Sequence, residues 1–250
     1  MQRNTLRTVA LLSGLLLNSM TFAADGKAHW GYDGHEGPSH WGDLSNDYAT
    51  CKTGKSQSPI NIDTTTAVKL ANIKFNYQAS AIDVVNNGHT IQVNYAKGSI
   101  LNVGGKNYKL LQFHFHSPSE HEVNGKPYDM VAHLVHQAAD GQLGVIGVLM
   151  KVGKANPVIA SIWKHLPKES GDHNKVDAIL NVAELLPGNH SYYNYSGSLT
   201  TPPCSEGVNW MVMQTPIEVS ADQVAAFTSI FAKSVRPVQP NNGRTIHASK

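Results

Sequence analysis

The chain has 250 residues, 15% of them charged, with 20 basic and 18 acidic side chains. Without Arg3 and Arg7 of the first segment, 18 basic side chains face 18 acidic ones, so the rest of the chain is close to neutral. A nucleic-acid or anionic-membrane partner needs a basic cluster, and the sequence contains none. We therefore expect neither kind of partner.

The first residues are typical of an export signal. Two arginines precede a mostly apolar run from Val9 to Leu17, and the small-residue segment Thr21–Ala24 follows as a cleavage site. The run is shorter than the ~20 apolar residues of a membrane helix, and no later stretch approaches that length. We expect a signal peptide over residues 1–23, one domain over 24–250, and a protein of the periplasm or the secreted fraction.

The next segment, Ala28 to Asn61, has little periodicity and much Gly, Pro, His and Trp, which indicates an irregular arm wrapped on a core. After it, the chain predicts mainly strands. The turn signal Asn87-Gly88 indicates a hairpin, and the apolar run Leu143–Val152 is typical of a strand buried on both faces. Further strands are expected over Ile73–Tyr77, Ala81–Val85, Thr90–Val93, Ser99–Val103 and Trp210–Met213.

Helices are few in the predicted pattern. Asn156-Pro157 can cap and start one helix, and the capping box Ser220-Ala-Asp-Gln223 starts another. The segment Val176–Leu186 is left open between helix and other structure. Together these patterns predict a mainly β, α+β fold with one extended sheet and peripheral helices.

The central stretch, Leu110 to His136, predicts two strands joined by a loop over Ser117–Lys126. Side chains of a strand alternate between its faces. In the first strand, one face therefore holds Gln112, His114 and His116, and the other holds Leu111, Phe113 and Phe115. The second strand carries Val131, His133 and Val135 on one side.

If these strands pair antiparallel, three imidazoles converge. Three neutral nitrogens with an open fourth position are what a catalytic zinc ion requires. A His-x-His pair alone is more often a half-exposed strand face, but a third histidine on the next strand favours the metal site. His136 is a rival for that third place. It lies an odd number of residues from His133 and should face the other way, so we choose His133.

Eight short motifs, in the same order and at about the same spacing, resemble those of the alpha-class carbonic anhydrases. They are His29-Trp-Gly-Tyr32, Gly37-Pro-Ser-His-Trp41, Gln57-Ser-Pro-Ile-Asn-Ile62, Asn86-Asn-Gly-His89, Gln112-Phe-His-Phe-His116, Ser119-Glu-His121, His133-Leu-Val-His136 and Ser198-Leu-Thr-Thr-Pro-Pro203. Any one motif is weak evidence, but eight in register are strong. The resemblance implies a large, twisted, mostly antiparallel sheet with short outer helices.

The resemblance also implies a reaction: reversible hydration of CO₂ to bicarbonate and a proton by zinc-bound hydroxide, with Zn²⁺ on His114, His116 and His133. Thr200 would donate a hydrogen bond to Glu120, which as a carboxylate only accepts. Thr200 can then only accept from the hydroxide, whose lone pair is left free to attack. The implied substrate pocket consists of Val135, Val145, Leu199, Thr201 and Trp210.

His89 matches the family's proton shuttle, and a pKa near 6.5 suits an imidazole for that transfer. Tyr32, Asn87 and Gln92 match the polar positions that hold the intervening waters. Strict alternation would place His89 and Gln92 on opposite faces, so we expect a bulge or twist after the turn.

The hydrogen-bond partners of the three histidines are expected to be Gln112 for His114 and a backbone carbonyl near Gly243 for His116. For His133 the sequence departs from the family, because Val131 stands where the relatives have a glutamate. Loss of such a partner typically weakens metal affinity or activity about 10- to 100-fold. We expect zinc to bind but to dissociate faster than in relatives with the glutamate.

Cys51 and Cys204 are the two cysteines, and an even pair in an exported chain predicts one disulfide. It would anchor the Thr200 loop to the arm, and secreted relatives carry a similar bridge; two free thiols are the alternative. Two other functions stay open. One is an exported zinc-binding protein without turnover, and the other is a zinc hydrolase with a larger substrate.

Overall fold

The computed structural model describes residues 28–250. The expected signal peptide, 1–23, lies outside these residues. No helix within residues 28–250 has both the length and the apolarity to cross a membrane.

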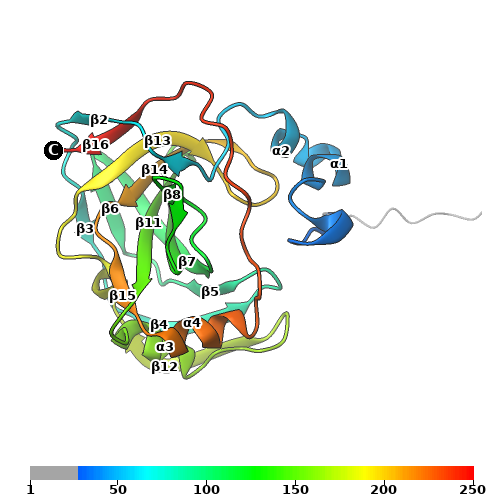
Figure 1. Ribbon diagram of the computed structural model, residues 1–250. Coiled ribbons are helices and arrows are strands. Elements are labelled where there is room, and N and C mark those ends of the chain that lie inside the picture. The colour runs from blue at the N-terminus through cyan, green and yellow to red at the C-terminus, as the bar shows by residue number, and fades with distance from the viewer. Residues whose placement is uncertain (1–27) are drawn as a thin grey trace, which may run out of the picture.

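One large sheet of 13 strands dominates the described part of the chain (Figure 1). Its main path runs β12-β4-β5-β7-β10-β11-β14-β13-β16-β2. Most neighbours pair antiparallel, and the pairs β11·β14, β11·β15 and β16·β2 are parallel. The predicted mostly antiparallel sheet is confirmed. A small second sheet of order β1-β8-β9 was not expected.

The strands, in chain order, are β1 (Asn61–Ile62), β2 (Thr65–Val68), β3 (Lys74–Asn76), β4 (Ser80–Asn86), β5 (Ile91–Asn94), β6 (Ile100–Val103), β7 (Lys106–His116), β8 (Glu122–Val123), β9 (Lys126–Pro127), β10 (Met130–Ala138), β11 (Leu143–Val152), β12 (His173–Leu180), β13 (Tyr192–Ser198), β14 (Glu206–Met213), β15 (Ile217–Val219) and β16 (Ile246–Ser249). The α-helices are α1 (Trp41–Leu44), α2 (Thr50–Thr53), α3 (Pro157–Trp163) and α4 (Ala221–Thr228), and the 3₁₀ helices are η1 (Gly34–Glu36), η2 (Asn46–Tyr48) and η3 (Val182–Leu185).

Both predicted helices form where their caps indicate. The side chain of Asn156 accepts from the backbone N–H groups of Val158 and Ile159 at the start of α3. Ser220 and Gln223 form the expected capping box of α4. The segment left open, Val176–Leu186, contains the end of β12 and the 3₁₀ helix η3, and no α-helix.

Two apolar clusters lie on opposite faces of β7 and β10. Phe113 and Phe115 belong to the larger one, which packs against α3 and α4. The smaller cluster contains Val131 and Trp210. Leu111 was expected beside Phe113 but is 43% exposed. The register of β7 against β10 skips Leu111, and the bulge turns its side chain away from the core.

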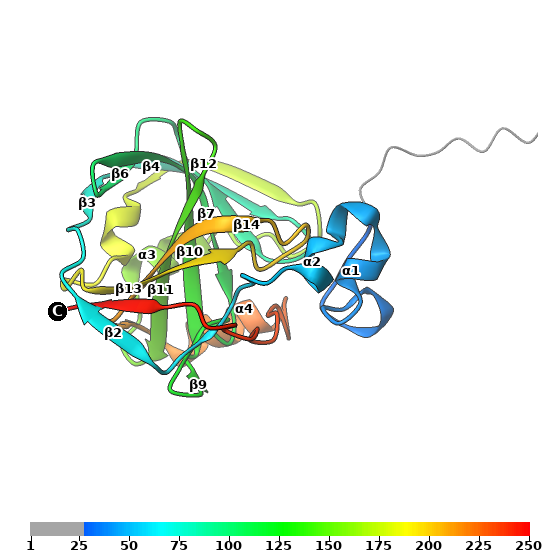
Figure 2. The ribbon, with the colours of Figure 1, turned by 90° about the horizontal axis from the view of Figure 1, so that it is seen from above.

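The N-terminal arm consists of four short helices set to one side of the sheet (Figures 1 and 2). Trp41 is fully buried there, and its indole N–H faces the carbonyls of Gly31 and Glu36. The predicted Cys51–Cys204 disulfide is formed, with an S–S distance of 2.08 Å. It fastens the arm to the loop that carries Thr200.

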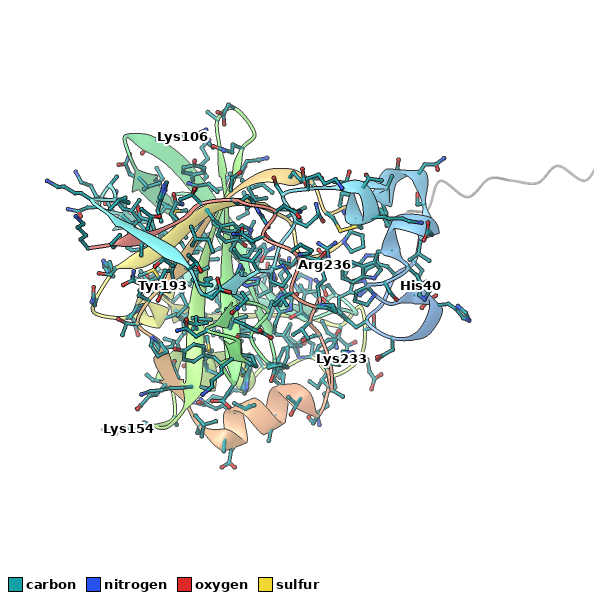
Figure 3. The ribbon with its side chains drawn as sticks, turned by 45° about the horizontal axis from the view of Figure 1, so that its top comes forward. His40, Lys106, Lys154, Tyr193, Lys233 and Arg236 are labelled. Carbon is teal, nitrogen blue, oxygen red and sulfur yellow. A yellow bond between two sulfur atoms is a disulfide. The ribbon has the colours of Figure 1, made fainter. Side chains whose placement is uncertain are left out.

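The C-terminal segment also ties the arm to the sheet. Arg236, labelled in Figure 3, is 2% exposed. Its guanidinium donates to the carbonyls of Cys51 and Ser58 and to the side chain of Gln57. These contacts join segments that lie about 180 residues apart in the chain.

Candidate metal centre

Three histidines on β7 and β10 face one another. The two strands pair antiparallel, with His133 opposite His114 and Val131 opposite His116. Directly opposed residues point to the same face of a sheet, so the three imidazoles meet above one face. Their candidate ligand nitrogens all lie within 4.8 Å of one another. The rival, His136, lies elsewhere, and its ring nitrogens face Tyr77 and the Gly144 carbonyl.

The contacts of each ring show which nitrogen can bind a metal. Gln112 Oε1 lies 2.9 Å from Nδ1 of His114, as predicted. Nδ1 of His116 donates to the backbone carbonyl of Ser234. The expectation of a carbonyl near Gly243 was therefore wrong. Among the described residues, neither ring makes a hydrogen bond through Nε2, so this nitrogen is available to a metal.

The third ring, His133, is turned the other way. Its Nδ1 lies 3.8 Å from Glu120 Oε2, and Nε2 of His116 lies 3.6 Å from the same oxygen. Nδ1 of His133 therefore faces the site. Its buried Nε2 has no hydrogen-bond partner in the described part of the chain, and Val131, two residues earlier on the strand, is a fully buried apolar side chain. Asp129, the nearest acid along the strand, accepts instead from the Val152 N–H.

Two of the three rings are in the protonation state that binds a metal ion. Burial, followed by the nearby His116, holds the pKa of His114 well below its ordinary value, and the same causes act on His133. Both rings are thus neutral at pH 7, the form in which imidazole binds metal. His116 Nε2 is a buried polar atom without a partner among the described residues. Such atoms are rare unless an ion or water satisfies them, so this donor set fits zinc.

Glu120 lies beside this set and is 2% exposed. Its Oε1 accepts from the backbone N–H of Arg236 at 3.0 Å, and its Oε2 has no hydrogen-bond partner within residues 28–250. Thr200 is buried in the loop after β13. The structure does not form the expected hydrogen bond between Thr200 and Glu120, and Oε2 is the acceptor still available for it.

The predicted apolar side chains gather next to the histidines. Val135 pairs with Val145 across β10 and β11, and Val145 pairs with Trp210 of β14. Leu199 packs against the same cluster. The Trp210 ring lies 4.9 Å from the His133 ring. The structure therefore places these apolar residues along one side of the histidine set.

A cavity of about 110 Å³ is lined by two of the three histidines, His114 and His116. Thr201, which was expected in the substrate pocket with the apolar residues, lines this cavity. The lining also brings together Tyr32, Asn87, His89, Gln92, Gln112, His114 and His116, with Trp30 and Thr90 in addition. Sequence reasoning missed the last two. Trp30 stands inside a motif that was used only for Tyr32, and it stacks on His89 at 3.6 Å between ring centroids.

The β4–β5 turn sets the place of His89. Asn87 Oδ1 accepts from the backbone N–H groups of His89 and Thr90, and Gly88 takes a positive φ of 84°. His89 thus belongs to the turn and not to a strand, so the alternation that would separate it from Gln92 does not apply. No bulge is required. Burial and the nearby His29 lower the pKa of His89.

A buried polar network lies next to the His133 ring. His121 Nε2 lies 2.6 Å from the Tyr195 hydroxyl, which lies 2.8 Å from Ser58 Oγ. Burial lowers the pKa of His121 to about 3, so this ring is neutral.

Three histidines that could hold one metal ion, at the edge of a cavity on a β-sheet, are typical of the mononuclear metalloenzymes. The sequence model described as eukaryotic-type carbonic anhydrase matches residues 36–250. The chain belongs to this family, the alpha-class carbonic anhydrases.

Individual relatives agree. The carbonic anhydrase of Neisseria gonorrhoeae is 45% identical over 246 residues, 96% of this chain and 97% of the relative. That of Nostoc sp. is 45% identical over 230 residues, 87% and 85% of the two chains. Among solved structures, the alpha-carbonic anhydrase from Thermovibrio ammonificans in complex with the inhibitor sulfanilamide is 48% identical with a TM-score of 0.87, and the match covers 89% of this chain and all of that one.

Proposed function

We propose that this protein hydrates CO₂ reversibly to bicarbonate and a proton, with Zn²⁺ held by His114, His116 and His133. The observation that carries the proposal is the convergence of three imidazoles, whose candidate ligand atoms lie within 4.8 Å of one another, beside a buried oxygen of Glu120 that has no hydrogen-bond partner within residues 28–250. When bound, zinc lowers the pKa of a water molecule to near neutrality and so supplies a nucleophile. Neutral ligands suit this chemistry because they leave the charge of the ion undiminished.

Glu120 and Thr200 orient the nucleophile. An ionised carboxylate only accepts hydrogen bonds, so in the working site Thr200 Oγ1 would donate a hydrogen bond to Glu120 Oε2, the oxygen that has no partner within residues 28–250. Thr200 Oγ1 is then left as an acceptor, and it selects an attacking oxygen that still carries a proton. The lone pair of that oxygen points away from Thr200, toward the substrate.

The apolar side chains bind the substrate. CO₂ is small and uncharged, so it suits the surface formed by Val135, Val145, Leu199 and Trp210. Thr201 lines the polar cavity beside His114 and His116.

His89 carries the proton out of the site. Its half-buried ring lines the same cavity as His114 and is reached from solvent. The neutral ring accepts a proton through waters held by Tyr32, Asn87 and Gln92 and then passes it to buffer. The lowered pKa of His89 favours the second transfer.

Localisation forms part of the proposal. We assign residues 1–23 to a signal peptide and 24–250 to one catalytic domain, and we place the protein in the periplasm or the secreted fraction. The Cys51–Cys204 disulfide supports this, because such bonds persist in oxidising compartments.

Stopped-flow measurement of CO₂ hydration tests the proposal. The metal-replete protein is expected to accelerate hydration, the chelator-stripped protein to lose that activity, and added zinc to restore it. A replete protein that binds zinc without turnover would instead support the alternative of a zinc-binding protein. Turnover of bulky esters without CO₂ hydration would support the hydrolase.

A further inference from the structure

Within residues 28–250, six buried side-chain polar atoms have no hydrogen-bond partner: Tyr32 Oη, His116 Nε2, Glu120 Oε2, His121 Nδ1, His133 Nε2 and Asn241 Oδ1. The proposed reaction accounts for His116 Nε2 and Glu120 Oε2, which face the metal centre. It does not account for two imidazole nitrogens, on His121 and His133.

These two nitrogens belong to neighbouring rings. The ring centroids of His121 and His133 lie 6.1 Å apart, and both rings pack on Trp210, at 4.6 and 4.9 Å. The fully buried His121 has its ring held by Tyr195 at Nε2. Its free nitrogen is therefore fixed in place, and it cannot turn to solvent.

The protonation of His133 follows from its orientation. Because Nδ1 faces the metal centre, the proton of the neutral ring is on Nε2. Within residues 28–250 that buried N–H is a donor without an acceptor, and leaving such a donor unpaired is destabilising. Val131, beside it on the strand, offers none, and Asp129 is engaged with Val152.

We propose that one buried water molecule bridges His133 Nε2 and His121 Nδ1, so that His121 is a positioning residue for the metal ligand His133. This rests on the proposed zinc site. A water can accept from the His133 N–H and either donate to or accept from His121, so it suits both tautomers of His121. Buried waters typically satisfy such otherwise unpaired groups. The chain from His121 through Tyr195 to Ser58 then orients His133 in place of a carboxylate.

Two substitutions of His121 separate this role from simple packing. His121→Asn keeps a polar atom near the position of Nδ1 and loses the contact with Tyr195. His121→Gln keeps a polar atom near Nε2, and with it the Tyr195 contact, but loses Nδ1. The control is His136→Gln, the same replacement of a buried histidine at a place without contact to the site.

Zinc content is measured first, and then the rate of zinc release into excess chelator. His121→Gln is expected to release zinc at least about 10-fold faster than the parent, while His121→Asn and the control stay near the parent rate. Equal rates for Gln and parent, or an Asn variant as fast as Gln, would overturn the proposal. A parent without stoichiometric zinc would refute the proposed function instead.

A measurement on the unaltered, zinc-loaded protein covers the case in which a variant does not fold. The imidazole N–H proton of His133 should give a slowly exchanging NMR signal with a cross peak to a long-lived water. A His133 N–H signal without contact to water would contradict the bridge. Val131→Glu should remove the water contact, because a carboxylate then accepts from His133 directly.

Discussion

Removal of the disulfide tests how the arm is held. In the Cys51→Ser/Cys204→Ser double variant, the unfolded chain has more conformational entropy because no bridge closes the loop between these residues. The two cysteines are 153 residues apart in sequence. For a closed loop of that size the chain-entropy model gives about 5 kcal/mol at 25 °C. This is an upper value, because denatured chains retain structure.

The assay is urea unfolding followed by tryptophan fluorescence, with both proteins stripped of metal so that zinc binding does not contribute. With a slope of about 3 kcal/mol per molar urea, the midpoint should fall by roughly 1.5 M. The parent protein under reducing conditions is the control, and its unfolding curve should superimpose on that of the double variant. A loss of less than about 1 kcal/mol would refute the reasoning, because it would show that the bridge does not limit the entropy of the unfolded chain.

Four further outcomes are expected. Val131→Glu should slow zinc release into chelator about 10-fold or more. Release no slower than in the parent would contradict the claim that zinc is held less tightly because His133 lacks a carboxylate partner. His89→Ala should lower kcat in dilute buffer with kcat/KM unchanged, and imidazole buffer should restore it; an unchanged kcat would exclude His89 as the shuttle. Thr200→Ala should lower kcat/KM about 100-fold while zinc stoichiometry stays at the parent value. Burial lowers the pKa of His136 to about 4 in the folded protein, so on acidification the unfolded chain takes up this proton before the folded one. The free energy of unfolding of the parent should therefore fall by about 3 kcal/mol as the pH drops from 6.5 to 4. In urea titrations His136→Gln should show a weaker dependence of stability on pH, and an equal dependence would contradict the lowered pKa of His136.

Local patterns predicted which three histidines converge. The two-residue period of β7 indicated His114 and His116, and the odd spacing between His133 and His136 excluded His136. Both inferences hold because side-chain direction in a strand is fixed by the backbone alone. The same rule failed at Leu111, where a bulge breaks the register. A bulge leaves no reliable mark in one sequence, since it depends on how the neighbouring strand pairs.

Long-range partners were the weakest part of the prediction. The carbonyl that serves His116 comes from Ser234, 118 residues later, in a segment without periodicity. Any backbone carbonyl has the same chemistry, so the residue type gives no signal. Trp30 was missed for a related reason: its ring stacks on His89 from the irregular arm, whose path is set by tertiary contacts.

Arg236 shows why the arm, the C-terminal segment and the metal centre act as one unit. Its backbone N–H fixes one oxygen of Glu120, and its guanidinium holds the carbonyls of Cys51 and Ser58. Burial lowers the pKa of Arg236 to about 10, while Glu120 acts in the opposite direction, so the group stays charged at neutral pH. A buried carboxylate is tolerated only near such a charge. The orientation of Glu120 therefore depends on contacts with the disulfide-linked arm as well as on the sheet.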